Sequence, residues 1–113
     1  MKIRAAVLNT MDAERPFSES RPLSIEELEL DEPQQGEVLI RMTAAGVCHS
    51  DLSVVDGNRP RPLPMALGHE GTGIVEEVGS GVEGLEVGDH VVTVFLPRCE
   101  DCDNCRTLSL IHI

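Results

Sequence analysis

Short apolar runs, each closed by turn-forming residues, follow one another along most of the chain. Within several of these runs apolar and polar side chains alternate, as at 37–46, where Val38, Ile40 and Met42 share one face. Such alternation is typical of half-buried strands. Strands are therefore predicted in five runs, at 3–8, 23–30, 37–46, 71–79 and 88–96.

The segments between these runs differ in kind. The stretch 11–22 is charged and contains proline, so it is expected to be a solvated excursion, and the prolines of 59–68 predict an extended loop. The stretch 49–57 predicts a short helix that ends at Gly57. With turn signals about every 8–12 residues, the pattern favours a mostly β barrel or sandwich.

Composition and charge exclude several classes of protein. A chain of 113 residues has room for one domain, and 20 acidic against 9 basic residues argue against nucleic-acid binding. No apolar stretch reaches the roughly 20 residues of a membrane span. The first ten residues become polar too soon for a secretory signal peptide. We therefore expect a cytoplasmic protein without nucleic-acid or membrane partners.

Four cysteines in such a chain indicate thiolate chemistry rather than disulfides. Cys99, Cys102 and Cys105 form a C-x2-C-x2-C pattern in a loop rich in Asp and Asn. Three thiols so close together cannot all pair as disulfides, since one would remain unpaired. Metal binding is therefore favoured, with zinc preferred to an iron–sulfur cluster. A structural zinc needs a fourth ligand, and no cysteine follows Cys105.

A second candidate site combines Cys48 in GVCHSD (46–51) with His69 in GHE (68–70). A thiolate and an imidazole are two of the three protein ligands that a catalytic zinc needs. The two residues are 21 positions apart, so the fold must bring them together. On these residues alone, a core thiol and a surface imidazole is the more frequent explanation, and both interpretations stay open.

These motifs together resemble the zinc-containing alcohol dehydrogenases of the medium-chain family. The segment GHEGTGIVEEVGSGV at 68–82 matches that family's signature, and GVCHSD, VGDHV (87–91) and the cysteine loop lie where the family has them. The resemblance covers 1–107. It implies a mostly β fold, a GroES-like β-barrel with a short helix and a Cys-rich zinc-binding loop, and a Rossmann domain that we expect to be absent from this chain.

The resemblance also implies roles for single residues. Cys48 and His69 would ligate a catalytic zinc, with Glu70 beside the metal as a transient ligand. Asp51 would hold the zinc-bound imidazole, and Ser50 would take the proton of the alcohol. The plainer alternative for Asp51 is a helix cap.

Three further assignments come from the same resemblance. His49 would face the pyrophosphate of the cofactor and Phe95 would line the substrate pocket, where the plainer alternatives are a solvated surface residue and a core residue. The three clustered cysteines would hold a structural zinc: Cys99, Cys102 and Cys105.

The function implied is that of a zinc-dependent alcohol dehydrogenase, which transfers hydride between a primary or secondary alcohol, or an aldehyde, and NAD or NADP. The full-length enzyme would be a homo-oligomer. Three departures matter: the third ligand of the catalytic zinc would lie beyond 113, the fourth structural cysteine would fall at Ile113, and a histidine often found three residues after Ser50 is Ser53 here. We expect no dehydrogenase activity from these 113 residues alone.

The segment 108–113, LSLIHI, is abruptly apolar and matches what a common sequencing-library adapter would encode in frame. We expect a non-native tail there and an incomplete domain at 1–107. A non-enzymatic zinc-binding module, with His112 as fourth ligand, is one alternative. Quinone or enoyl reductase relatives normally lack the zinc ligands. Zinc enzymes acting on polyols, threonine or glutathione-bound formaldehyde stay open.

Overall fold

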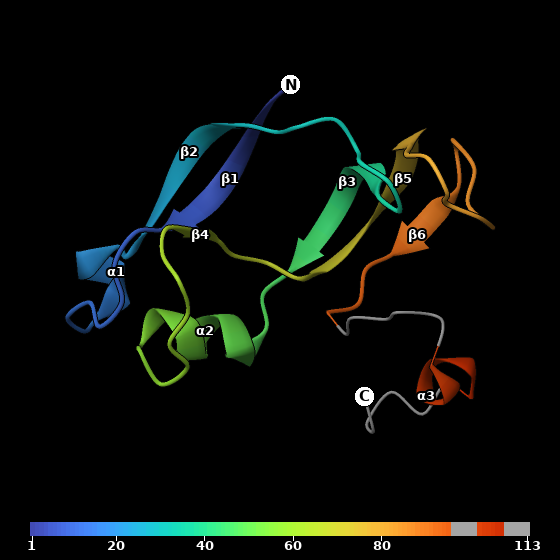
Figure 1. Cartoon of the computed structure of the whole chain (residues 1–113). Coiled ribbons are helices and arrows are strands. Elements are labelled where there is room, and N and C mark those ends of the chain that lie inside the picture. Colours follow the sequence, from blue (N-terminus) through green and yellow to red (C-terminus); the bar gives the residue numbers. More distant parts are fainter. Residues whose placement is uncertain (96–101, 108–113) are drawn as a thin grey trace.

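The computed structural model describes residues 1–95 and 102–107 (Figure 1). Strands outweigh helices in these residues, so the predicted mostly β fold is confirmed. The strands are β1 Lys2–Leu8, β2 Leu23–Glu29, β3 Val38–Gly46, β4 Met65–Ala66, β5 Glu70–Val78 and β6 His90–Val92. The helices are α1 Phe17–Ser20, α2 His49–Val55 and α3 Asp103–Arg106.

The strands form two antiparallel three-stranded sheets, in the orders β2-β1-β4 and β3-β5-β6. Figure 1 shows the two sheets beside each other, with α2 below them. Within the described ranges the sheets stay open instead of closing into one barrel. The GroES-like expectation therefore holds as an open, two-sheet arrangement.

Two short elements lie where loops were expected, because apolar side chains there find partners. In 11–22, α1 forms and Phe17 packs against the cluster around Leu8, so this excursion is only partly solvated. In 59–68, Met65 pairs with Leu8 through the two-residue strand β4. The predicted short helix after Cys48 is present as α2, and Gly57 follows its end with a φ of +74°.

The β3–β5 pairing decides where the site residues lie. It sets Gly46, the last residue of β3, opposite Glu70, the first residue of β5, so the chain entering α2 runs beside the chain entering β5. Close backbone approach along this pair explains Gly73, where an added Cβ would lie 2.5 Å from the carbonyl oxygen of Arg41. The pairing is interrupted by register shifts between Leu39 and Ile40 and between Met42 and Ala44, as β-bulges or similar irregularities produce.

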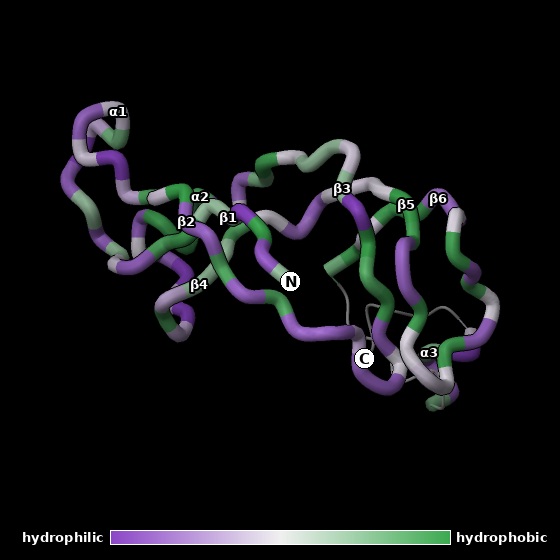
Figure 2. The backbone as a smooth tube through the Cα atoms, turned by 90° about the horizontal axis from the view of Figure 1, so that it is seen from above, coloured by the Kyte–Doolittle hydropathy of each residue, from purple (hydrophilic) through white to green (hydrophobic). Residues whose placement is uncertain are grey.

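The buried core is small. Leu8, Val54 and Val55 form its centre, so α2 packs on the sheet that contains β1. Figure 2 shows hydrophilic and hydrophobic stretches alternating along the strands, and several large apolar side chains stay exposed. The radius of gyration, 16.3 Å, exceeds the roughly 13 Å expected for a compact domain of this length, so the molecule is open.

The helices of the described residues are short. The longest is α2, with seven residues. None of them has the length and apolar character that crossing a bilayer requires.

Candidate metal centre

Three candidate metal ligands meet where α2 and β5 begin. Cys48 is the N-cap residue of α2, His69 directly precedes β5, and Glu70 is its first residue. One ligand atom from each, the Cys48 sulfur, a His69 ring nitrogen and a Glu70 carboxylate oxygen, all lie within 4.8 Å of one another. The fold therefore brings together the thiolate and imidazole that are 21 positions apart in sequence.

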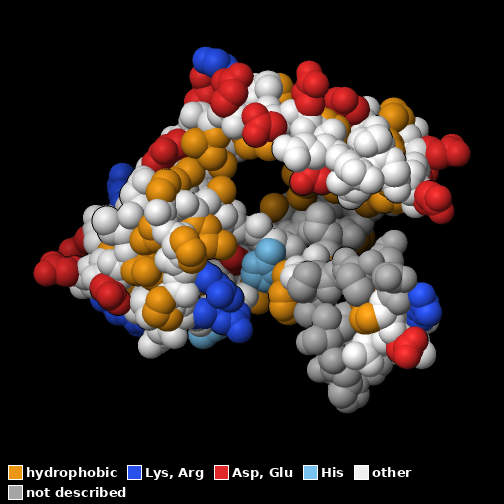
Figure 3. Space-filling view, in the orientation of Figure 1, with side chains coloured by type: hydrophobic (Ala, Val, Ile, Leu, Met, Phe, Trp, Pro, Cys, Tyr) orange, Lys and Arg blue, Asp and Glu red, His pale blue; other side chains and the backbone are white. Residues whose placement is uncertain are grey.

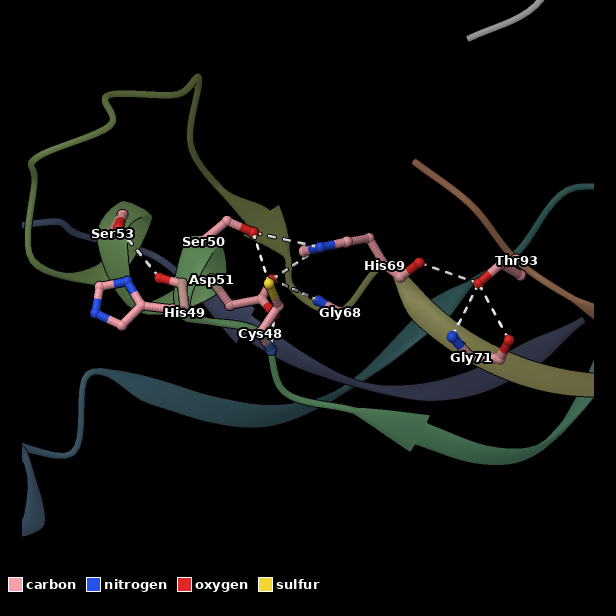
Figure 4. A network of polar contacts seen from close by, with 9 residues as sticks. All are labelled: Cys48, His49, Ser50, Asp51, Ser53, Gly68, His69, Gly71 and Thr93. Atoms are coloured by element: carbon pink, nitrogen blue, oxygen red, sulfur yellow. Dashed lines mark hydrogen bonds and ion pairs between the residues drawn. The ribbon is translucent and has the colours of Figure 1, made fainter. Parts of the chain in front are cut away.

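The Asp51 carboxylate ties these segments together. Its Oδ2 accepts a hydrogen bond from the backbone N–H of Cys48 at 3.0 Å, and its Oδ1 lies 3.2 Å from Nδ1 of His69. Oδ1 also lies 3.4 Å from the backbone nitrogen of Gly68, which donates to it. Asp51 is only 7% exposed, and Figure 4 shows it between α2 and the His69 ring. Its two oxygens thus hold the start of the helix and the orientation of the imidazole.

The Ser50 hydroxyl lies next to both principal donors. Ser50 Oγ is 3.3 Å from the Cys48 sulfur, to which it donates, and 3.3 Å from Nε2 of His69 (Figure 4). The hydroxyl has one proton, which it can donate to the sulfur or to the Nε2 lone pair, and its oxygen has lone pairs that can accept a proton as its own leaves. Ser50 is placed to exchange a proton with a group bound at Cys48 and His69.

Thr93, just after β6, fixes the backbone that carries His69. Its hydroxyl lies 3.0 Å from the carbonyl oxygen of His69 and accepts a hydrogen bond from the N–H of Gly71 at 2.9 Å (Figure 4). One side chain from the far strand of the sheet thus supports the residues on both sides of Glu70.

These donors fit a zinc ion. Zinc–sulfur and zinc–nitrogen bonds of about 2.3 and 2.0 Å in a tetrahedral site set the two ligand atoms roughly 3.5 Å apart. The 4.8 Å limit of the cluster is compatible with that spacing. Because Asp51 engages Nδ1 of His69, the imidazole proton belongs on Nδ1 and the Nε2 lone pair faces Ser50 and the cluster. A thiolate with a neutral imidazole is a typical zinc donor set.

A cavity of about 230 Å³ adjoins the cluster. Ser50 and His69 form part of its wall, and Phe95 forms another part. The Phe95 ring meets the His69 ring edge to face, with centroids 5.5 Å apart, and Phe95 is 69% exposed. Phe95 is therefore a wall of the cavity and not a core residue. The remaining lining residues are Asp51, Val54, Arg59, Arg61, Met65 and Leu67.

Other predicted residues lie apart from this cluster. His49 is exposed, and Figure 4 shows its ring on the side of α2 away from His69. Ser53 Oγ donates to the carbonyl oxygen of His49 at 3.1 Å, so it does not extend the Ser50 contact. Cys102 is the N-cap residue of α3 and Cys105 is buried within that helix. Cys99 lies outside the described residues, so the structural zinc stays a prediction.

Thr93, Arg59 and Arg61 were not predicted from the sequence as site residues. Thr93 has no motif of its own, because its role arises from the pairing of β5 with β6. Arg59 and Arg61 do have a signal, the alternation RPRP at 59–62, in which prolines restrict the backbone between two cations.

Comparisons with known proteins place this geometry in a family. The model of the alcohol dehydrogenase GroES-like domain matches residues 34–111. The chain belongs to this family. An NDMA-dependent alcohol dehydrogenase of Amycolatopsis methanolica is 50% identical over 107 residues, which is 95% of this chain and 27% of that protein.

Solved structures agree. The benzyl alcohol dehydrogenase of Acinetobacter calcoaceticus has a TM-score of 0.78 and 40% identity, covering 95% of this chain and 27% of that one. A cobalt- and zinc-bound thermostable alcohol dehydrogenase of Pyrobaculum aerophilum has a TM-score of 0.77 and 38% identity, covering 95% and 31%. The chain thus spans about a quarter of the length of the curated relatives it matches.

Proposed function

We propose that this chain is the zinc-binding, N-terminal part of a zinc-dependent alcohol dehydrogenase that works in the cytoplasm with NAD or NADP. One observation carries the proposal: Cys48, His69 and Glu70 offer metal ligands within 4.8 Å of one another, with the Ser50 hydroxyl in contact with the first two. A similar solved structure is that of a cobalt- and zinc-bound alcohol dehydrogenase, which supports a metal-binding role for this cluster. The substrate is a small alcohol or aldehyde.

The residues divide the work as follows. Cys48 and His69 hold the zinc, which when bound supplies a Lewis acid that makes an alcohol hydroxyl easier to deprotonate. Asp51 keeps the imidazole proton on Nδ1 of His69, so that Nε2 stays a ligand. Ser50 accepts the proton of the alcohol at Oγ.

Ser50 lies on the wall of the cavity, and Ser53 is engaged with the backbone of α2. The proton therefore passes from Ser50 to water in the cavity, and not along the helix. Glu70, at the edge of the cluster, is a transient ligand. Its carboxylate lies close to the backbone of Gly46, because a Cβ added at Gly46 would lie 3.2 Å from Oε2 of Glu70. His49 faces the cofactor from the outer side of α2.

Two metal sites belong to the proposal. The second is the structural zinc of the cysteine loop, held by Cys99, Cys102 and Cys105 with a fourth ligand. It stabilises the loop and takes no part in proton transfer.

Cobalt substitution tests the catalytic site. Cobalt(II) bound by the purified chain should give a thiolate charge-transfer absorption that falls in Cys48→Ser and His69→Gln. Cys102→Ser serves as the matched variant for the second site and should remove a different part of the signal. If Cys48→Ser and His69→Gln bind cobalt as the parent chain does, the catalytic zinc site is refuted.

A chimera tests the activity. This chain should replace the matching N-terminal segment of the Acinetobacter benzyl alcohol dehydrogenase, to which it is 40% identical. We expect zinc-dependent reduction of NAD or NADP by an alcohol, lost in Cys48→Ser and lowered about 10²–10⁴-fold in Ser50→Ala, the range of general acid–base contributions. A folded, zinc-loaded chimera whose turnover does not respond to Ser50→Ala would contradict the proton role.

A further inference from the structure

Two arginines line the cavity beside the metal ligands. Arg59 and Arg61 come from the loop that joins α2 to β4, and they share this cavity with Ser50, His69 and Phe95. The chain has only 9 basic residues against 20 acidic ones, so two cations in one small cavity form a local exception to its charge. In Figure 3, blue Lys and Arg side chains gather beside a pale-blue His, while red acidic side chains spread over the outer edges.

Neither guanidinium makes an ion pair within residues 1–95 and 102–107. The pairs there use other cations, and the carboxylates closest along the chain are already engaged. Asp56 lies 3.3 Å from Arg15, and Asp51 lies 3.2 Å from His69. Arg59 and Arg61 are both exposed and line the cavity, and no carboxylate among the described residues serves as their counter-ion.

The loop that carries them is tied to α2. The backbone N–H of Arg59 donates to the carbonyl oxygen of Ser53 at 2.7 Å, and that of Asn58 donates to Oδ1 of Asp56 at 3.1 Å. Pro60 and Pro62 restrict the backbone on either side of Arg61. A tethered, proline-restricted loop reduces the entropy lost when the side chains order around a ligand.

The remaining walls describe the rest of the ligand. Ser50 and His69 supply the polar contacts at the metal cluster, whereas Val54, Met65 and Phe95 are apolar. The volume, about 230 Å³, lies below the roughly 300–1,000 Å³ of pockets for drug-sized molecules. The cavity suits a small molecule with a hydroxyl, an apolar body and an anionic group. Guanidinium groups bind carboxylates with paired, charge-assisted hydrogen bonds.

We propose that Arg59 and Arg61 are specificity residues that select an alcohol carrying a carboxylate. The placement of the alcohol hydroxyl at the metal cluster rests on the proposed function. The assignment of the anionic group rests on the cavity alone. A phosphate of the nicotinamide cofactor has the same anionic chemistry. The carboxylate is favoured because the arginines share the cavity with Ser50 and Phe95, whereas His49, proposed to face the cofactor, does not line it.

The test measures binding to the metal-free chain, so it does not depend on turnover. Nuclear magnetic resonance titrations of the ¹⁵N-labelled chain would compare 4-(hydroxymethyl)benzoate with its neutral amide, following the Arg Nε and His69 signals. We expect the carboxylate to bind roughly three- to tenfold more tightly, a modest factor because exposed charges are screened by water. Arg59→Gln/Arg61→Gln should erase this preference, and Arg59→Lys/Arg61→Lys should keep part of it.

The matched control is Lys2→Gln/Arg4→Gln. It removes an equal number of positive charges from the exposed face of β1 and should leave the preference unchanged. Equal binding of carboxylate and amide, or a preference that survives Arg59→Gln/Arg61→Gln in a chain with an unchanged amide spectrum, overturns the proposal. Inorganic pyrophosphate forms a second arm. If it shifts the same Arg signals and the carboxylate does not, the site belongs to the cofactor and the substrate assignment is wrong.

The cobalt titration separates this inference from the proposed function. A carboxylate preference that depends on Arg59 and Arg61, in a chain whose Cys48 and His69 bind no cobalt, would support the anion site and refute the dehydrogenase. Cobalt binding without the preference would leave the dehydrogenase standing and overturn the anion site.

Discussion

A single carboxylate shows how the site is built at the scale of residues. The sequence offered two interpretations of Asp51, a helix cap and a partner of the metal-binding histidine. The structure contains both contacts, because Oδ2 accepts from the N–H of Cys48 while Oδ1 meets Nδ1 of His69. The two candidate zinc ligands are therefore held by one buried side chain.

Replacing that charge should weaken metal binding more than it weakens the fold. Asp51→Asn keeps an oxygen that can accept from Cys48 but removes the negative charge beside His69. Loss of such a partner typically lowers metal affinity about 10–100-fold, and we expect a decrease in that range for zinc in a competition titration with a chelator.

Asp89→Asn is the control. Asp89 accepts a backbone hydrogen bond from Glu86, three residues earlier, at 2.8 Å, as Asp51 does from Cys48, but it has no contact with the cluster. Equal zinc affinity in Asp51→Asn and Asp89→Asn would show that the His69 contact does not support metal binding.

Thr93 makes a second prediction at this scale. Thr93→Val keeps the shape of the side chain and removes the hydroxyl that bonds Gly71 and His69. Part-buried backbone groups left unpaired should cost about 1–3 kcal/mol of unfolding free energy in urea denaturation. Thr43→Val, which removes one exposed hydrogen bond to Thr72, should cost less than half as much. Similar losses in the two variants would contradict a special role for Thr93.

At the scale of elements, the β3–β5 pair and α2 were readable from sequence for different reasons. Period-two alternation predicted the strands, because a strand with one covered face must alternate. The helix after Cys48 was predicted from its polar start and from Gly57. The elements α1 and β4 were missed, since each is only a few residues long and depends on tertiary contacts of Phe17 and Met65 with the Leu8 cluster.

The same contrast applies to the site. The proximity of Cys48 and His69 followed from a resemblance, because no local pattern joins residues on different elements. Thr93 and the two cavity arginines depend on sheet pairing and on a loop path, which the sequence did not reveal.

The β3–β5 register makes an element-scale prediction. Gly73→Ala would set a Cβ 2.5 Å from the Arg41 carbonyl oxygen, and the paired backbone cannot move away without losing the ladder. Overpacking of this kind costs about 1–3 kcal/mol or more. In Gly71→Ala the closest atom is the flexible end of Met42, so the loss in unfolding free energy should be smaller. If Gly71→Ala is the more destabilised variant, the register argument is wrong.

At the scale of the whole molecule, residues 1–95 and 102–107 contain little buried core to stabilise the fold. Its buried apolar centre is built around Leu8, Val54 and Val55, its radius of gyration is 16.3 Å, and Phe95 and Val47 are among the large apolar side chains that stay exposed. The candidate metal cluster lies where α2, packed on the first sheet, meets the first residues of β5 in the second sheet. A ligand bound there joins the two halves.

Zinc should therefore stabilise this molecule by an amount that depends on Cys48 and His69. A ligand that binds only the folded state at 100 times its dissociation constant adds about 2.7 kcal/mol to the unfolding free energy, less whatever binding the unfolded thiols retain. We expect a gain approaching that value in urea denaturation monitored by circular dichroism.

Cys48→Ser should remove the part of the gain that comes from this cluster, and Cys102→Ser should remove only the part that comes from the cysteine loop. Because the cluster lies between α2, which packs on β1, and the start of β5, the Cys48→Ser loss should appear in the signals of β1 and β5 alike when amide exchange is followed residue by residue. Zinc protection confined to one sheet would contradict the view that the metal centre joins the two halves of the fold.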